Sequence, residues 1–268
     1  MKKHVLIFSS ILFAGGLAAY GILNDKYAYV PQAETTCKAQ FVSTAFTRNI
    51  LKPVEHVDFF YDFGPRFNPI TKKTLAEATS VSDFIDQNEI DRMDGIRSTT
   101  LIILENERRT DKSSSGKSEI LTSEQLKMIH SLGYSVNFLL RAEFNTKDAQ
   151  AASKGENIYY PHMTVVPEKQ AAFIGGKNLL LDYFRENNGA NTSNLDEKKL
   201  RSAKLYFTVT KEGKVSNARV DYSCGYPKID QDMLELVKSL SEQWVPAEDE
   251  RGEKVDQELV ISYGVVGC

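Results

Sequence analysis

The residues of this chain that could bind a metal ion or act as nucleophiles are few and far apart. Histidine occurs only at His4, His56, His130 and His162. These histidines are not spaced from one another, or from a cysteine, as metal ligands usually are, so the sequence predicts no metal site. Motifs for a serine nucleophile, a phosphate-binding loop or a dinucleotide fold do not occur either. We therefore expect neither an enzyme nor a bound cofactor.

The three cysteines allow one kind of redox chemistry, a disulfide bond. Cys37 lies near the N-terminus, whereas Cys224 and Cys268 end two segments with strand patterns. If another strand separates these two segments, the two Cα atoms lie about 9–10 Å apart, whereas a bridge needs about 7 Å or less. A disulfide between Cys224 and Cys268 therefore requires the strand ends to curl together. Two free thiols are the alternative, and the sequence leaves both open.

Composition indicates an ordinary globular protein without a nucleic-acid partner. Of the 268 residues, 41% are hydrophobic and 26% are charged, and the formal net charge is −3. This length allows one or two domains with their own cores. A basic stripe with interleaved aromatic residues does not occur, so we expect no binding to nucleic acid.

An uncharged apolar stretch at the N-terminus predicts export. Lys2 and Lys3 precede residues 4–24, whose apolar part has about the 20 residues that cross a bilayer as a helix. The positive-inside rule keeps both lysines in the cytoplasm and places the rest of the chain on the opposite side. A cleaved signal peptide shares these features, so residues 1–24 are either a membrane anchor or a signal peptide. Residues 25–55 then read as a tether.

The C-terminal part of the chain has the clearest strand and helix patterns. Alternating apolar residues predict a hairpin with strands 204–210 and 214–224, whose loop contains Gly213. An apolar stripe then predicts a helix from Pro227 onward, and residues 257–266 predict a last strand. The residues expected in the core of this unit are Phe207, Val209, Val220, Met233, Val237, Trp244 and Pro246.

These residues, in this order, resemble the C-terminal domain of the TonB family. The motifs are residues 165–173 with Gly175-Gly176, Phe207–Thr210, Gly213–Val215, Val220–Ser223, Ile229-Asp230, Trp244-x-Pro246-Ala247 and Gly252-x-x-Val255. The resemblance covers residues 160–268 and implies an independent β-β-α-β domain with a small antiparallel sheet. It also implies an energy transducer, held in the inner membrane by a single helix. Such a protein couples proton-driven motor subunits to a TonB-dependent transporter of the outer membrane.

Residues 56–159 predict a second folded region in place of the spacer that the family usually carries. Helix patterns at 71–87 and 124–132 alternate with several strand patterns, which lie at 57–63, 98–104, 135–144 and 158–166. Residues 108–118 are polar and predict a loop. This order of elements indicates an α/β sandwich and resembles the OmpA-like peptidoglycan-binding domain, although the motif that binds peptidoglycan has no match. The expected fold class is α+β, with this sandwich between an N-terminal membrane helix and the C-terminal domain.

A small antiparallel sheet leaves an edge strand that could bind a partner. The free N–H and C=O groups of such a strand can pair with an extended peptide of another protein. We predict that the last strand is this edge and that it binds a peptide of the transporter. The predicted partner-binding residues are Leu259, Val260, Ile261, Ser262, Tyr263, Gly264 and Val265.

Two functions fit these patterns. The first is a periplasmic energy transducer or adaptor that is anchored in the inner membrane and binds outer-membrane transporters by strand addition. The second is a periplasmic binding or scaffold module, associated with the cell wall, that transmits no force. The short tether favours the second function, because about 30 residues span only about 100 Å when fully stretched.

Overall fold

The computed structural model describes residues 59–147, 157–192 and 195–266. The predicted anchor or signal peptide at 1–24 and the predicted tether at 25–55 lie outside these residues. The described part of the chain is mixed α+β and belongs to one compact unit. Within it, each helix is too short or too polar to cross a membrane.

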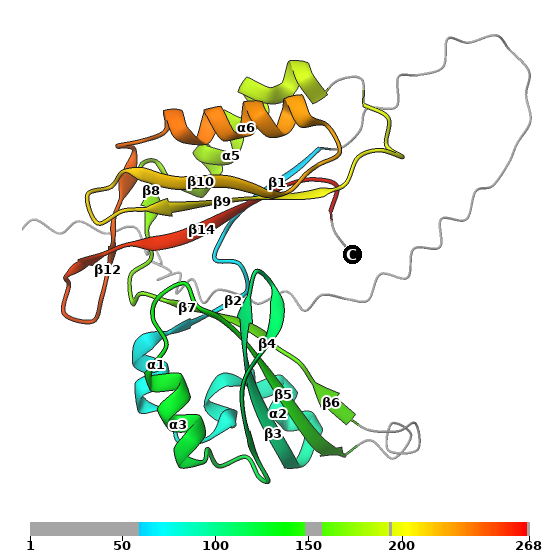
Figure 1. Cartoon of the computed structure of the whole chain (residues 1–268), viewed down its shortest axis with the longest axis vertical. Coiled ribbons are helices and arrows are strands. Elements are labelled where there is room, and N and C mark those ends of the chain that lie inside the picture. Colours follow the sequence, from blue (N-terminus) through cyan, green and yellow to red (C-terminus); the bar gives the residue numbers. More distant parts are fainter. Residues whose placement is uncertain (1–58, 148–156, 193–194, 267–268) are drawn as a thin grey trace, which may run out of the picture. The chain divides into compact units, whose positions relative to one another are not determined.

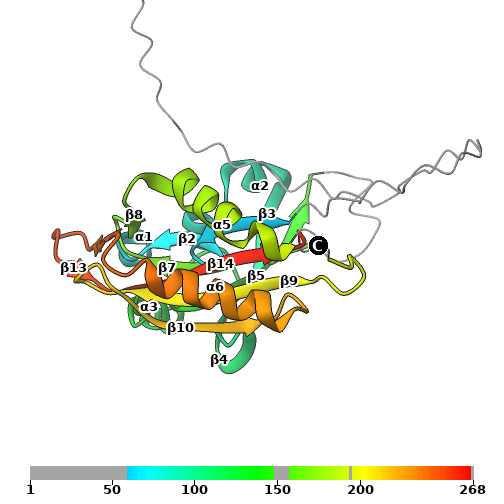
Figure 2. The same ribbon diagram turned by 90° about the horizontal axis from the view of Figure 1, so that it is seen from above.

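One sheet has four antiparallel strands in the order β1-β14-β9-β10 (Figure 1). Its strands are β1 (Phe60–Gly64), β9 (Ser202–Val209), β10 (Val215–Tyr222) and β14 (Gln257–Gly264). Two helices, α5 (Gly176–Thr192) and α6 (Pro227–Ser239), lie over one face of this sheet, as Figure 2 shows. Alternate residues of the central strands face these helices and form the core, among them Leu205, Phe207, Leu259, Ile261 and Tyr263.

The β9–β10 hairpin and the start of α6 follow from residues at their turns. Gly213 has a φ of +79°, and a Cβ there would lie 2.6 Å from the carbonyl oxygen of Trp244, so only glycine fits. Asp230, in the first turn of α6, accepts hydrogen bonds from the Cys224 N–H at 3.0 Å and the Tyr263 hydroxyl at 2.6 Å. These elements begin and end within about two residues of the positions that the sequence predicts.

Trp244 lies in the core of this part of the chain. Its side chain is 4% exposed. Its ring centroid lies 5.9 Å from that of Phe63, 5.5 Å from Phe173 and 5.2 Å from Phe207. Two short strand pairs flank it, β8 (Ala172–Phe173) with β11 (Trp244–Val245) and β12 (Ala247–Glu248) with β13 (Lys254–Val255). The other expected core residues are also buried or half-buried. The buried ones are Phe207, Val209, Met233 and Val237, and the half-buried ones are Val220 and Pro246.

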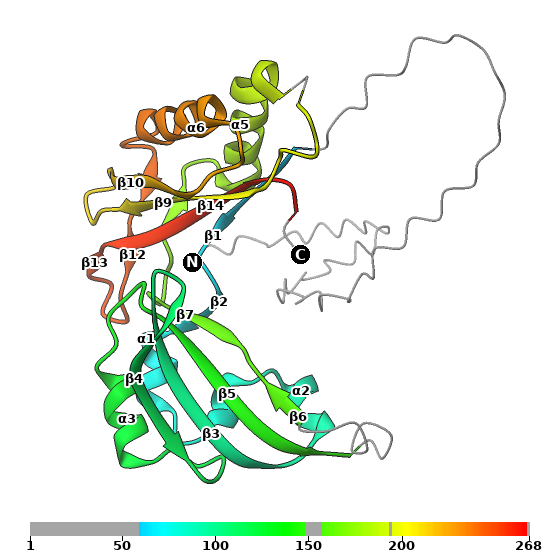
Figure 3. The same cartoon turned by 45° about the vertical axis from the view of Figure 1, so that its right-hand side comes forward.

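A second sheet has the strand order β2-β7-β5-β3-β4, with β6 also paired to β5. Figure 3 shows β5 between β3 on one side and β6 and β7 on the other. The strands are β2 (Asn68–Thr71), β3 (Met93–Glu105), β4 (Arg108–Gly116), β5 (Asn137–Thr146), β6 (Asn157–Tyr159) and β7 (His162–Val166). Its helices are α1 (Lys72–Glu77), η1 (Val81–Phe84), α2 (Gln87–Arg92) and α3 (Ser123–His130). Side chains of α1, η1 and α3 form a second core with this sheet.

Two local predictions in this region are wrong. Residues 108–118, predicted as a loop, contain strand β4 instead. Strand β4 lacks apolar alternation because most of its side chains are exposed, and its backbone ladder with β3 holds it in place. The single helix predicted at 71–87 is broken into α1 and η1, because Ser80 starts a new helical turn with its own capping box.

Two strands cross the boundary that we expected between residues 159 and 160. Strand β1 precedes that boundary but pairs with β14. Strand β7 follows it but pairs with β2 and β5. Alternation along a strand shows which side chains share a face and does not identify the neighbouring strand. Neither sheet is therefore built from one continuous part of the chain.

Each of the two sheets contains a unit with the same order of elements, β-β-α-β. One unit is β3-β4-α3-β5 and the other is β9-β10-α6-β14. In each, the strand after the helix pairs antiparallel with the first strand of the hairpin. In each, a further antiparallel strand covers the outer side of that last strand, β7 on β5 and β1 on β14. The covering strand of each unit comes from the segment that precedes the other unit.

Candidate functional site

The predicted partner-binding strand is not an edge. Strand β14 pairs with β9 on one side and with β1 on the other, from Phe60 opposite Gly264 to Gly64 opposite Val260. The prediction of a free edge at residues 259–265 is therefore wrong, because the strand pattern near residue 60 gave no sign of its distant partner. Five of the predicted residues are buried, namely Leu259, Val260, Ile261, Tyr263 and Gly264. The other two, Ser262 and Val265, are half-buried.

Strand β10 is an edge of the same sheet. It stands last in the strand order, so one side of its backbone has no strand partner in the described part of the chain. A cavity of about 1290 Å³ lies along residues 219–222 of this strand. Residues 103–108 of the β3–β4 hairpin also line it, as do residues 131–133 and 135–137 from the end of α3 to the start of β5. The cavity thus joins an unpaired strand edge to surfaces of both β-β-α-β units.

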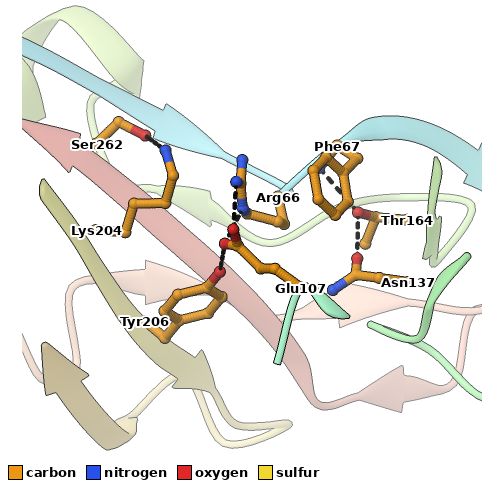
Figure 4. Close-up of polar contacts among 8 residues, drawn as sticks. All are labelled: Arg66, Phe67, Glu107, Asn137, Thr164, Lys204, Tyr206 and Ser262. Carbon is orange, nitrogen blue, oxygen red and sulfur yellow. Dashed lines mark hydrogen bonds and ion pairs between the residues drawn. The ribbon is translucent and has the colours of Figure 1, made fainter. Parts of the chain in front are cut away.

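Glu107, in the turn between β3 and β4, links the two sheets (Figure 4). Its carboxylate accepts two hydrogen bonds from Arg66, one of them 2.8 Å long, and a third from the hydroxyl of Tyr206 on β9. Burial disfavours the carboxylate, but these donors outweigh burial and lower the pKa of Glu107. Burial and the carboxylate both raise the pKa of Tyr206. Glu107 is therefore charged and Tyr206 protonated at neutral pH.

The backbone of this turn is held in an unusual conformation. Asn106 and Glu107 have φ values of 50° and 61°. Two successive positive φ values are typical of a type I′ hairpin turn, where glycine or asparagine is preferred to glutamate. A strained residue persists where surrounding contacts hold it. The bonds of Glu107 to Arg66 and Tyr206 are such contacts.

Further polar contacts surround this cluster. The Glu258 N–H donates to the Ser135 hydroxyl at 2.9 Å. The hydroxyl of Thr164 accepts from the Phe67 N–H at 2.9 Å and donates to the Asn137 side chain at 2.6 Å (Figure 4). Some apolar or aromatic residues are buried although they belong to neither of the two cores that the helices form with the sheets. They are Leu104, Leu139, Val166, Tyr206 and Val260. Contacts beyond the two helix-covered cores therefore help to hold the described residues together.

Charged and apolar side chains both line the cavity. Two of the lining cations are paired, Lys112 with Glu105 at 2.8 Å and Arg219 with Glu258 at 2.8 Å. The apolar or aromatic residues along the walls are Ile103, Leu104, Met128, Leu132, Val136, Tyr206, Val220 and Tyr222. A surface of this mixed kind is typical of protein–protein contacts, where apolar area is interspersed with polar groups.

Metal ligands and Cys224, the other features considered in the sequence, do not contribute to this cavity. Groups of His, Cys, Asp and Glu that could hold a metal ion do not occur within the described ranges. Cys224 has a free thiol that is fully buried. Of the two alternatives that the sequence left open, the structure therefore has Cys224 as a free thiol, and Cys268 lies outside the described residues. Strand β9 separates β10 from β14, as the distance argument supposed.

The Cys224 thiol should resist alkylation in the folded protein. Burial is the main cause that raises the pKa of Cys224 to about 12, and thiolate is the reactive form. With iodoacetamide at pH 8, peptide mass spectrometry should find Cys224 unmodified in the native chain and modified in urea. Rapid native modification, or a peptide in which Cys224 is cross-linked to Cys268, would contradict this placement.

Replacing Glu107 with glutamine should weaken the fold and change its acid sensitivity. The lowered pKa means that the charged cluster stabilises the fold above the ordinary value of 4.5, and that this contribution is lost as pH falls through the lower folded-state pKa. Glu107→Gln should reduce the free energy of unfolding by about 1–3 kcal/mol at pH 7. Its loss of stability below pH 4.5 should be smaller than that of the parent. Urea unfolding between pH 3 and 7 measures both effects.

Glu105→Gln is the matched control for this measurement. Glu105 pairs with Lys112, and both side chains are more than half exposed. Such a pair contributes about 0–1 kcal/mol. If the two variants have the same stability and the same pH profile, Glu107 does not link the sheets as the structure indicates.

Comparison with known proteins gives no family for this chain. No protein-family model matches it, and neither a curated protein nor a solved structure does. The sequence reasoning also missed the cluster of Arg66, Glu107 and Tyr206. The only local signal near it was the pair Arg108-Arg109 beside a polar segment, which we interpreted as part of a solvated loop.

Proposed function

We propose that this chain is a periplasmic adaptor that binds an extended segment of a partner protein by strand addition. The observation that carries the proposal is the edge of β10, which has no strand partner among the described residues and lies beside a cavity of about 1290 Å³. The N-terminal apolar stretch, residues 4–24, supports export and anchoring in the inner membrane. The β-β-α-β order at residues 202–264 supports the finer proposal of a TonB-like C-terminal domain.

An added strand at β10 has both backbone and side-chain support. Each new backbone hydrogen bond contributes about 0.5–1.5 kcal/mol net. Alternate side chains of the added strand point to opposite faces of the sheet. Those on the helix-free face meet the cavity, where Tyr206, Tyr222 and the α3–β5 turn offer contacts. Pairing supplies affinity for any extended segment, and the cavity supplies selectivity.

A peptide selection with two proline variants tests this proposal. A display library of randomised ten-residue peptides is selected on the full chain, and the enriched peptides are titrated against Arg219→Pro and Val220→Pro. Between two irregularities of the ladder, these neighbours form consecutive pairs with Tyr206 and Leu205, so one N–H points toward β9 and the other outward. We expect the variant that loses the outward N–H to stay folded and to bind at least about tenfold more weakly.

Two outcomes would contradict strand addition at β10. One is that no peptide is enriched on the parent chain. The other is that both variants fold and bind enriched peptides as tightly as the parent does. Circular dichroism melting of each variant shows whether it is folded before binding is measured.

A second candidate function, the energy transducer, is favoured by the shortness of β1. This strand has five residues, and Tyr61 is its one buried side chain. A transporter peptide could then replace β1 on β14, and motor subunits would bind the membrane helix, as the TonB resemblance implies. In the peptide selection, this function predicts binding that survives both proline variants of β10 and increases with Tyr61→Ala, which weakens β1.

A further inference from the structure

We infer that the partner segment bound along β10 carries acidic residues, which bind three cationic side chains at the C-terminal end of that strand. This inference rests on the proposed function and names the chemistry of the partner. The three cations are Lys198, Lys199 and Arg201. They line a hollow of about 580 Å³ together with Ser202, Asp221, Tyr222, Ser223 and Gly225.

The hollow has an excess of positive charge. Asp221 is the one carboxylate that lines it, and this group already pairs with Arg219 at 3.2 Å. Among the described residues, Lys198, Lys199 and Arg201 have no carboxylate oxygen within 4.0 Å of their charged nitrogens. All three side chains are exposed. They are therefore available to a ligand that brings carboxylates.

The backbone that carries these cations is fixed in position. Leu200, between two of them, is buried in the core. The Arg201 N–H donates to the Cys224 carbonyl at 2.9 Å. The chain also packs closely against two glycines, since a Cβ on Gly225 would lie 2.2 Å from the Lys199 carbonyl oxygen and one on Gly264 would lie 2.2 Å from that of Arg201. A rigid backbone loses less entropy when its side chains bind an anion.

The hollow adjoins the cavity along β10. Asp221 and Tyr222 line both of them. Tyr222 is 44% exposed. A segment paired with β10 therefore passes Tyr222 and then meets the cations. Because the hollow lies next to the β10 edge, an acidic extended peptide is favoured over a lipid headgroup as the occupant.

Charge reversal tests this inference with the same peptide library. The test variant is Lys198→Glu/Lys199→Glu/Arg201→Glu, and the control, with an equal change of charge on exposed lysines elsewhere, is Lys117→Glu/Lys211→Glu/Lys254→Glu. Peptides selected on the parent should be enriched in Asp and Glu at one end. We expect the test variant to bind them about tenfold or more weakly, and the control to bind them within about twofold of the parent. Added salt should weaken binding to the parent and to the control, but much less to the test variant.

The outcomes separate this inference from the function on which it rests. If peptides are enriched that lack acidic residues, or if acidic peptides bind the test variant as tightly as the parent, the inference is wrong while strand addition stands. If no peptide is enriched, both fail. Vesicles that contain 30% phosphatidylglycerol provide the lipid probe. Charge-dependent binding to these vesicles, without charge-dependent peptide binding, would assign the cations to a membrane surface and overturn the inference.

Discussion

Replacing Trp244 with alanine should lower the free energy of unfolding by about 3–5 kcal/mol, the range for a buried aromatic side chain. The ring is 4% exposed and contacts aromatic rings from three separate segments, at Phe63, Phe173 and Phe207. Alanine would leave a cavity at the point where β1, β8 and β9 meet. Urea unfolding followed by circular dichroism measures the loss.

Trp244→Phe is the control that separates packing from hydrogen bonding. The indole Nε1 is buried without a hydrogen-bond partner in the described structure. Phenylalanine therefore removes no bond and should cost less than half of what alanine costs. A parent chain whose tryptophan fluorescence is that of a solvent-exposed indole would contradict the placement of Trp244.

A chain reduced to residues 160–268 should not form a stable monomer, although the sequence indicated an independent domain. The truncation removes β1 and so exposes the outer side of β14. It also removes Tyr61, which is 5% exposed, stacks on Phe184 and accepts a hydrogen bond from Asn188 at 3.1 Å. Unpaired apolar edges of this kind associate with one another. We expect sedimentation to show oligomers and thermal unfolding to lose its sharp transition.

A synthetic peptide with the sequence of residues 57–65 should restore the truncated chain. The peptide re-forms the five residue pairs between β1 and β14. The same peptide with Tyr61→Asp and Phe63→Asp is the control, because it keeps the backbone groups but cannot fill the core. A truncated chain that is monomeric and melts at the temperature of the parent would show that β1 is dispensable.

The sequence predicted elements well where one strand or helix buries a single continuous face. Strands β9, β10 and β14 and helix α6 follow directly from apolar periodicity, together with Gly213 and Pro227 at their turns. Strand β4 could not be predicted in this way, because its side chains are mostly polar and exposed. Strand β4 is held by backbone hydrogen bonds to β3, and such bonds do not require any particular side chains.

The candidate site was largely hidden from the sequence because it depends on pairing between distant segments. Alternation at residues 57–63 correctly predicted a strand. Its partner β14 lies about 200 residues later in the chain, and pairing across a loop of that length leaves no pattern in the sequence near residue 60. Glu107, Arg66 and Tyr206 come from three segments and have no shared spacing. The strand we predicted as an edge is consequently covered on both sides, and the end strands of that sheet in the described part of the chain are β1 and β10.

Backbone hydrogen exchange of the full chain, with and without a selected peptide, tests the central claim most directly. We predict that amides of β14 are already protected in the free chain, because β1 and β9 pair with both of its sides. The peptide should add protection within residues 215–222 and leave residues 60–64 unchanged. Loss of protection at 60–64 with no gain at 215–222 would contradict the account, because it would show that the partner replaces β1 instead of adding to β10.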